Sequence, residues 1–419
     1  MTALDAPART QGEDTLLSAF TESARAHEPA RAAAMARFAA LGLPGRRDEP
    51  WHYTDLRSLL KIVPSMADAP AQESGARFAF EAGARIVFSG AHSSASALPP
   101  GVSLRALAPD SAPLLREADD ALAALNAALA TQACEIVVAK EAGAVSLHLA
   151  FRDLQDAAAM LARRVRVRLE PGAQALIVES HESRDGLAHL ANALVEFELA
   201  EGAQASHVRL DAAGDTATSL STLCVRAHAR ARFSTFTLAM GARLARHQIF
   251  LRFDGENAQA QVSGVALLRG KQHGDTTLSI DHATPHCESR ETFRSVVDGE
   301  ATGVFQGRIR VAQHAQKTDA RMSSRALLLS PDATMNNKPE LEIFADDVQC
   351  AHGATCGELD DDLLFYLMAR GLPRAEAEAL LLQAFVAEAM EAVADEALRE
   401  TLMSAARDWL ARRAPRKAA

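Results

Sequence analysis

From about residue 160 to about residue 350, the sequence predicts a succession of short β-strands separated by turn residues, with no helix between them. Apolar and charged residues alternate in Arg164–Leu169, Leu194–Leu199 and Phe305–Val311. Because successive side chains of a strand point to opposite faces, each of these segments predicts a half-buried strand. So long a succession of strands excludes an all-helical fold and leaves few β architectures.

A weak internal repeat lies in the same region. The sequence LEPGAQA at residues 169–175 recurs as LAEGAQA at residues 199–205, and a fainter echo lies at Ala258–Ala260. Repeats of this kind are typical of a solenoid, in which each coil packs on the next. A β-sandwich would also show short alternating strands, although this run is long for one sandwich. The pattern alone leaves both folds open.

Both ends of the chain have helical patterns. Apolar residues at spacings of three and four predict a helix over Leu16–Leu41, which Gly42 ends. A second helical segment, Leu114–Leu129, interrupts the first part of the strand region.

Two helices are predicted near the C-terminus. The first covers Asp360–Arg370 and is closed by Gly371, and Pro373 opens the second, which is predicted to run through Ala411. The second helix has a broad apolar face, so it must pack either on the strand region or on a partner protein.

Charge and composition exclude several classes of protein. With 44 Lys and Arg against 54 Asp and Glu, the net charge is -10, which argues against a nucleic-acid partner. No run approaches 18 apolar residues, so no membrane span is expected. The N-terminal residues include acids where a signal peptide would be apolar, and the five cysteines are dispersed without a CxxC pair. These features predict reduced thiols and a cytoplasmic protein.

Motifs for catalysis are missing from the sequence. It has no GxSxG elbow and no phosphate-binding glycine loop, so any use of ATP would belong to another chain. His282, His286 and Cys287 cluster as candidate zinc ligands, but there is no HExxH motif and the spacing is not that of a zinc finger.

The segment DDVQCAHGAT contains the best candidate metal ligands, Cys350 and His352. If this segment is extended, the two side chains share one face of the strand, with Cα atoms about 6 to 7 Å apart. Thiolate and imidazole suit iron or zinc, but two ligands make an incomplete site. The others would come from other coils, from Cys356 or from another subunit. Alternatively, Cys350 is a buried small hydrophobe and His352 a turn residue before Gly353.

Several motifs in this order resemble the SufB/SufD family of iron-sulfur cluster assembly scaffold proteins, and within it the SufD branch. They are EPWHYTDL (49–56), DHATPHCESR (281–290), VFQGRIRV (304–311), AQKTDAR (315–321), KPELEIFADDVQCAHGATCG (338–357) and LFYLMARGL (364–372). The resemblance implies a mainly β fold, with a right-handed parallel β-helix core between N-terminal and C-terminal α-helical domains. The expected domains are residues 1–75, residues 76–357 with a helical insertion near 114–129, and residues 358–419.

The resemblance also implies partners and a role. It implies a non-catalytic scaffold subunit that pairs with SufB and binds the ABC-type ATPase SufC through its C-terminal helices; an isolated chain could form homodimers. The residues expected to face SufC are Phe365, Tyr366, Arg370, Gly371 and Phe385. At the contact with SufB, His352 is expected to help build a transient iron-sulfur cluster that this chain alone does not hold, and Cys350 is the candidate assisting ligand. Cys356 matches no family position, and a structural role in a turn is expected for His282, His286 and Cys287.

Two other functions stay open. One is a purely structural partner of the ATPase with no metal-ligand role. The other is a β-helix carbohydrate-active enzyme that uses Asp346 and Asp347, but adjacent residues of a strand point to opposite faces and make poor acid-base partners.

Overall fold

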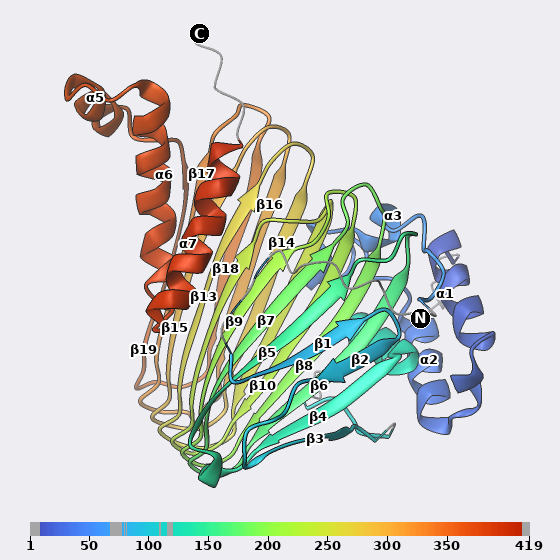
Figure 1. Ribbon diagram of the computed structural model, residues 1–419. Helices are drawn as coiled ribbons and strands as arrows, with labels where there is room; N and C mark the ends of the chain where they lie inside the picture. The colour runs from blue at the N-terminus through green and yellow to red at the C-terminus, as the bar shows by residue number, and fades with distance from the viewer. Residues whose placement is uncertain are drawn as a thin grey trace, which may run out of the picture.

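The computed structural model describes residues 9–67, 78, 80, 82–108, 110–114 and 120–412. Over these residues the chain forms an N-terminal group of helices, a long two-sheet solenoid and a C-terminal group of helices (Figure 1). The expected domain boundary near residue 75 lies outside the described residues.

The N-terminal helices are α1 (Gln11–Thr21), a 3-10 turn η1 (Ala24–His27) and α2 (Pro29–Leu41). The prediction of one continuous helix over Leu16–Leu41 is therefore wrong. Pro29 has no amide hydrogen to donate and disfavours the helical conformation of Glu28, which lies at ψ 116°. The predicted end at Gly42 is confirmed, since its φ of 70° suits glycine. Two further short helices follow, η2 (Glu49–Trp51) and α3 (Leu56–Leu59).

The solenoid consists of two sheets, and the chain passes from one to the other at almost every turn. In chain order, the strands of the ten-stranded sheet of the described residues are β1 (Ala84–Ser89), β2 (His92–Ala95), β5 (Ala144–Asp153), β7 (Gln174–Ser183), β9 (Gln204–Ala212), β11 (Arg232–Ala239), β13 (Gln259–Leu268), β15 (Glu288–Val297), β17 (Asp319–Leu328) and β19 (Gln349–Gly357). Those of the nine-stranded sheet are β3 (Val102–Ala106), β4 (Gln132–Val138), β6 (Met160–Leu169), β8 (Leu190–Leu199), β10 (Thr218–Ala227), β12 (Leu244–Phe253), β14 (His273–His282), β16 (Thr302–Val311) and β18 (Thr334–Ile343).

Pairing between the strands decides between the two folds left open above. Each strand from β6 to β17 pairs in parallel with the strand two places before it and the strand two places after it, as coils of a solenoid do, and β5 pairs in parallel with β1 and β7. The repeat follows this register, because Gln174 in β7 is the direct partner of Gln204 in β9. Gly172 and Gly202, at φ 73° and 66°, form equivalent turns before these strands. A parallel β-solenoid is confirmed and a sandwich is excluded.

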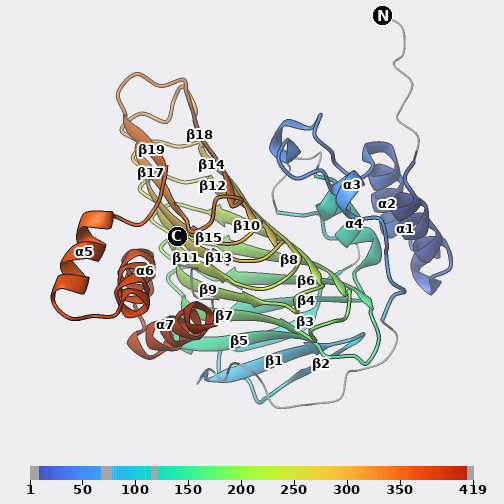
Figure 2. The ribbon, with the colours of Figure 1, turned by 90° about the horizontal axis from the view of Figure 1, so that it is seen from above.

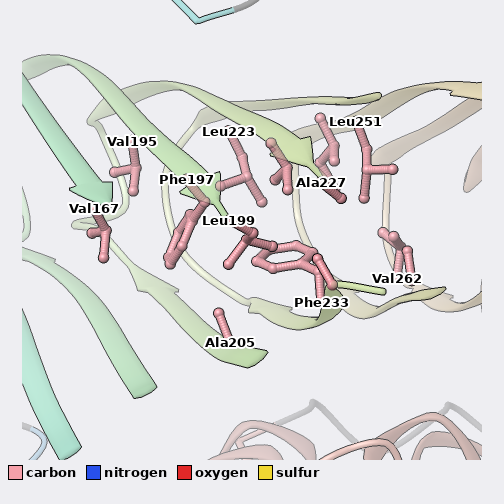
Figure 3. Packing of buried hydrophobic residues seen from close by; sticks show 14 of the residues in the cluster. Val167, Val195, Phe197, Leu199, Ala205, Leu223, Ala227, Phe233, Leu251 and Val262 are labelled. Carbon is pink, nitrogen blue, oxygen red and sulfur yellow. The ribbon is translucent and has the colours of Figure 1, made fainter. Parts of the chain in front are cut away.

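The main hydrophobic core fills the inside of the solenoid. Predicted inward residues of β8, namely Val195, Phe197 and Leu199, are buried there (Figure 3). The same strands are buried on their outer face too, unlike the prediction of half-buried strands: Glu196 accepts a hydrogen bond from the amide of Leu114 at 2.7 Å and one from Arg164 Nε at 2.8 Å. The chain around Leu114, before α4, covers this outer face. The local residue pattern of a strand cannot show that a distant segment will cover it.

Helix α4 covers Ala121–Leu129, and its N-cap Asp120 accepts a hydrogen bond from the amide of Ala123 at 2.7 Å. The prediction of a helix starting at Leu114 is too long, because residues 110–114 are irregular and 115–119 lie outside the described residues.

The C-terminal helices are α5 (Asp361–Ala369), α6 (Arg374–Met390) and α7 (Glu396–Ala411). The predicted end of the first helix is confirmed, with Gly371 at φ 93°. The prediction of one long second helix is wrong: the chain breaks before Asp395, which caps α7 by accepting from the amide of Leu398 at 2.8 Å.

The two helical units flank opposite sides of the solenoid (Figure 2). Helices α6 and α7 cover part of the outer face of the ten-stranded sheet, where Leu382, Val386 and Trp409 pack against residues such as Val208 and Phe236. The N-terminal helices and α4 pack on the nine-stranded sheet. None of the described helices has both the length and the apolar character that crossing a membrane requires.

Candidate functional site

The last coil of the solenoid is open at its end. Within the described part of the chain, β18 pairs only with β16 and β19 only with β17, so one edge of each strand has backbone donors and acceptors that no strand there uses. Most of β19 is exposed and β18 is half-buried, whereas the middle strands are largely buried. At the other end, the sheets finish in the antiparallel strands β2 and β3.

Cys350 and His352 both lie in β19 on the face that points into the solenoid. Their direct partners in β17 are Ala320 and Met322, whose side chains are buried in the core. Residues paired in register share a face, so the expected one-face arrangement of the two ligands is present. Their face is exposed to an approaching molecule only because no further coil follows.

The two side chains have different surroundings. Cys350 is half-buried against the core, and this burial raises the pKa of its thiol above the ordinary value. His352 is exposed. A thiol that resists ionisation becomes a ligand most readily when a metal ion displaces its proton.

The described residues do not complete a metal site by themselves. No three His, Cys, Asp or Glu side chains among them lie close enough to hold a metal ion. Cys356 shares the inner face, but it lies four positions along the chain from His352, which is about 13 Å along a strand. Cys350 and His352 are therefore half a site.

The candidate zinc ligands at the turn between β14 and β15, namely His282, His286 and Cys287, have separate surroundings. His282 is fully buried inside the solenoid, its Nε2 lies 3.0 Å from Ser289 Oγ, and burial lowers its pKa to about 3. His286 takes the turn position at φ 60°, and Cys287 is buried with its Sγ 3.4 Å from the Gly255 carbonyl. These positions agree with a structural role. Of the two acids considered for glycoside chemistry, Asp347 is paired with Lys317 in the turn before β19.

Helix α5 and its neighbours place the residues expected to face a partner. Phe365 is 73% exposed and Tyr366 55% exposed, and the Arg370 guanidinium lies 5.0 Å from the Tyr366 ring. Gly371 is exposed beside them. Phe385 is not part of this surface, because it packs toward the solenoid, where Arg294 lies 5.6 Å from its ring.

The EPWHYTDL segment docks on the outer face of the nine-stranded sheet. Trp51 is 5% exposed, and the guanidinium of Arg246 from β12 stacks 3.9 Å from its ring. The carbonyl of Pro50 accepts from Arg246 Nη2 at 2.8 Å and from Gln306 Nε2 at 3.0 Å, and Glu49 pairs with Lys338 of β18. The expectation that the aromatic residues serve packing holds for Trp51. The stacking of Arg246 on Trp51 could not be predicted from the sequence, because no residue pattern distinguishes a strand arginine that stacks on an aromatic ring from one that faces solvent.

A charged cluster inside the solenoid also escaped the sequence analysis. Glu179 accepts from His181 Nε2 at 2.5 Å, His207 Nε2 at 2.9 Å and Arg209 Nε at 3.1 Å, and Arg209 also pairs with Asp211 at 2.8 Å. All five side chains are at least nine-tenths buried. The charged row lies on the same inner face of β7 and β9 as the core residues Ile177 and Ala205.

Comparison with known proteins supports the resemblance. Residues 151–385 match the family model described as SUF system FeS cluster assembly, SufBD core domain. The chain is 32% identical over 241 residues to the iron-sulfur cluster assembly protein SufD of Escherichia coli, a match that covers 58% of this chain and 57% of that protein. It is 29% identical over 389 residues to an iron-sulfur cluster assembly SufBD family protein of Synechocystis, covering 84% of each.

The chloroplastic protein ABCI7 of Arabidopsis thaliana is 30% identical over 241 residues, covering 57% of this chain and 50% of that protein. The chain thus spans about half the length of two of these relatives and most of the third. The family match covers more than half of the chain and includes most of the solenoid and the Cys350–His352 strand. This chain therefore belongs to the SufBD family of the SUF iron-sulfur cluster assembly system.

Proposed function

We propose that this chain is a SufD-type scaffold subunit of a cytoplasmic SUF assembly complex, in which it pairs with SufB and binds the ATPase SufC. The observation that carries the proposal is the half-site at the open end: Cys350 and His352 share an inner face that a neighbouring subunit can reach. Unpaired strand edges favour pairing with another strand, so β18 and β19 are where SufB would dock.

His352 is the proposed ligand of the nascent cluster, and Cys350 assists it. SufB would supply the ligands that this chain lacks, so the cluster would be transient and shared by two subunits. Because His352 is exposed, its imidazole can meet a ligand set from the other side without rearrangement of the solenoid.

SufC would bind the exposed surface of α5, formed by Phe365, Tyr366 and Arg370. Exposed aromatic residues beside an arginine are the composition typical of protein interfaces. Helix α6 is tied to the solenoid through Glu388, which pairs with Arg294 of β15 at 2.6 Å. A movement of these helices on ATP binding by SufC would therefore act on the sheet that ends in β19.

The test is anaerobic reconstitution of the complex from this chain, SufB and SufC, with iron and acid-labile sulfide measured per complex. Replacing a ligand removes a direct metal bond, so we expect His352→Ala to lower cluster content about ten-fold or more, and Cys350→Ala to lower it less. His92→Ala is the matched control, because His92 is exposed in β2 at the far end of the same sheet.

An intact complex with unchanged cluster content in His352→Ala would favour the purely structural partner. Failure of the wild-type chain to associate with SufB and SufC would contradict the scaffold role itself.

A further inference from the structure

A hollow of about 710 Å³ lies between the N-terminal helices and the outer face of the nine-stranded sheet. One wall is formed by the turn after α2 together with η2, and the other by residues of β12, β14, β16 and β18. The start of α4, at Asp120 and Ala121, completes the lining. Hollows of this volume at the junction of two packed units are typical places for small-molecule binding. The described residues that line it include neither Cys350 nor His352, so it is separate from the half-site.

Acidic side chains dominate the charge around this hollow. The carboxylates among its described lining residues are Asp48, Glu49, Asp120, Glu340 and Glu342. Arg308 is the only cation among the described residues of the lining, and Lys338 of β18 pairs with Glu49 and Glu340. The carboxylates outnumber the cations even when Lys338 is counted. A hollow with this excess of negative charge attracts cations and repels anions.

These carboxylates are arranged for an extended cation and not for a single metal ion. No three His, Cys, Asp or Glu side chains of the described residues lie close enough together to hold a metal. The acids come from three parts of the chain, namely the start of η2, the N-cap of α4 and strand β18. Carboxylates from three elements around one hollow are complementary to a ligand whose positive charges are spaced along its length.

A hydrogen-bond acceptor in the lining, the Oε1 atom of Gln306, is a second and independent feature. Gln306 is 5% exposed, and its Nε2 donates to the Pro50 carbonyl at 3.0 Å and to Thr277 Oγ1 at 3.4 Å. Because a carbonyl oxygen can only accept, these contacts fix which end of the amide is Nε2. Oε1 then has no donor among the described residues. A largely buried acceptor without a donor is unfavourable, and an ammonium group in the hollow would supply the missing donor.

We propose that this hollow binds an aliphatic polyamine, a chain of methylene groups that carries ammonium groups at intervals. One ammonium group donates to Gln306 Oε1, and the others lie against the carboxylates of η2 and β18. The methylene groups contact the apolar part of the lining, which includes Leu41, Pro44 and Phe250. Because its acids come from both sides of the hollow, the ligand ties the N-terminal helices to the solenoid.

The test is isothermal titration calorimetry of the full-length chain with spermidine. Gln306→Lys keeps a donor for the Pro50 carbonyl, but it removes the acceptor and brings a positive charge into the hollow. We therefore expect this variant to bind spermidine at least about ten-fold more weakly than the wild-type chain. Gln261→Lys is the matched control, because it adds the same charge at an exposed position of β13 in the other sheet.

A second variant changes only the charge of the lining. Glu342→Gln removes one half-buried carboxylate and should weaken spermidine binding about two-fold to five-fold. Glu198→Gln, a half-buried acid of β8 in the same sheet, is its control and should bind as the wild-type chain does. Far-ultraviolet circular dichroism of each variant checks that the fold is kept.

Limited proteolysis gives a readout that simple charge attraction would not move. A ligand held by both units stabilises their contact, so spermidine should slow cleavage of the N-terminal helices in the wild-type chain and not in Gln306→Lys. Mg²⁺ at the same concentration should neither displace spermidine nor give this protection.

Three results would overturn the proposal. They are equal spermidine affinity of Gln306→Lys and Gln261→Lys, displacement of spermidine by an equal concentration of Mg²⁺, and a wild-type chain that shows no saturable binding of spermidine. Binding of an oligolysine peptide without binding of spermidine would assign the hollow to a protein partner and would also overturn it.

Discussion

Glu179 is the residue around which the charged interior of the solenoid is organised. Burial acts to raise the pKa of its carboxyl, but hydrogen bonds from His181 and His207 outweigh burial and hold that pKa well below its usual value. The carboxylate is therefore ionised inside a protein core, where only its three donors offset the lost hydration.

Replacing Glu179 should be among the most destabilising single changes in the chain. Glu179→Ala leaves Arg209 and two imidazoles without their shared acceptor, and removing one partner of a buried ion pair costs about 3 to 5 kcal/mol. Urea unfolding followed by circular dichroism measures the change. Glu201→Ala is the control: its pair with Arg230 is exposed, so a loss below about 1 kcal/mol is expected. Similar losses for both variants would contradict the role of burial.

Glu291 is a buried acid with the opposite behaviour. Burial raises the pKa of its carboxyl to about 8, with Ser289 and Arg290 lowering it only in part. The folded chain thus keeps a proton that the unfolded chain releases above pH 4.5, the ordinary value. The contribution of this group to stability is complete below pH 4.5, falls as the pH rises toward about 8 and levels off above that pH.

Glu291→Gln should remove this pH dependence. Relative to the wild-type chain, the variant should gain about 1.4 kcal/mol in free energy of unfolding for each pH unit within that window. Chemical unfolding at about pH 5 and about pH 8.5 measures both values, and comparing the two proteins cancels the other titrating groups. Glu288→Gln, an exposed position on the same strand, should track the wild-type chain. If the free energies of unfolding of Glu291→Gln and the wild-type chain differ by the same amount at both pH values, Glu291 is ionised throughout and the prediction is contradicted.

At the scale of elements, the EPWHYTDL segment is the docking element of the N-terminal helices. Its contacts reach four strands of one sheet: Arg246 on β12, Asp275 on β14, Gln306 on β16 and Lys338 on β18. A segment held by several successive coils fixes the helical unit in one position along the solenoid.

Trp51→Ala should loosen this unit from the solenoid. Loss of a buried aromatic ring costs about 3 to 5 kcal/mol, and Arg246 would lose its stacking partner. Limited proteolysis should then cut the N-terminal helices faster while the solenoid resists. Tyr53→Ala is the control, because Tyr53 is only partly buried and its ring contact is with the neighbouring His52. Equal protection of Trp51→Ala and wild type would contradict the docking role.

Helix boundaries show where sequence patterns were sufficient. Glycine ended helices at Gly42 and Gly371 as predicted, because the backbone there has positive φ. The breaks before Pro29 and Asp395 were missed, since alanine-rich flanks continue the helical period across them. The hydrophobic repeat shows which residues of a helix share a face. Where a helix ends depends instead on its capping residues and on where the chain must turn to stay packed.

At the scale of the whole molecule, the two ends of the solenoid are not equivalent. One end finishes in the antiparallel strands β2 and β3, whereas the other finishes in the parallel strands β18 and β19. The half-site and the pair between Lys338 and Glu49 both lie in the last two coils at the open end. The end that carries Cys350 and His352 is the one at which the proposed shared site would meet another subunit.

The amino-acid sequence by itself determined the solenoid's repeat, the helical ends and the shared face of Cys350 and His352. These features follow from local periodicity, which is set by the two-residue and 3.6-residue repeats of strand and helix. Only the tertiary structure decided that Met322 lies beside His352, that Arg246 stacks on Trp51 and that Glu179 faces inward. Such neighbours come from different coils, and their contact depends on the register of strands some 30 residues apart, which no local pattern contains.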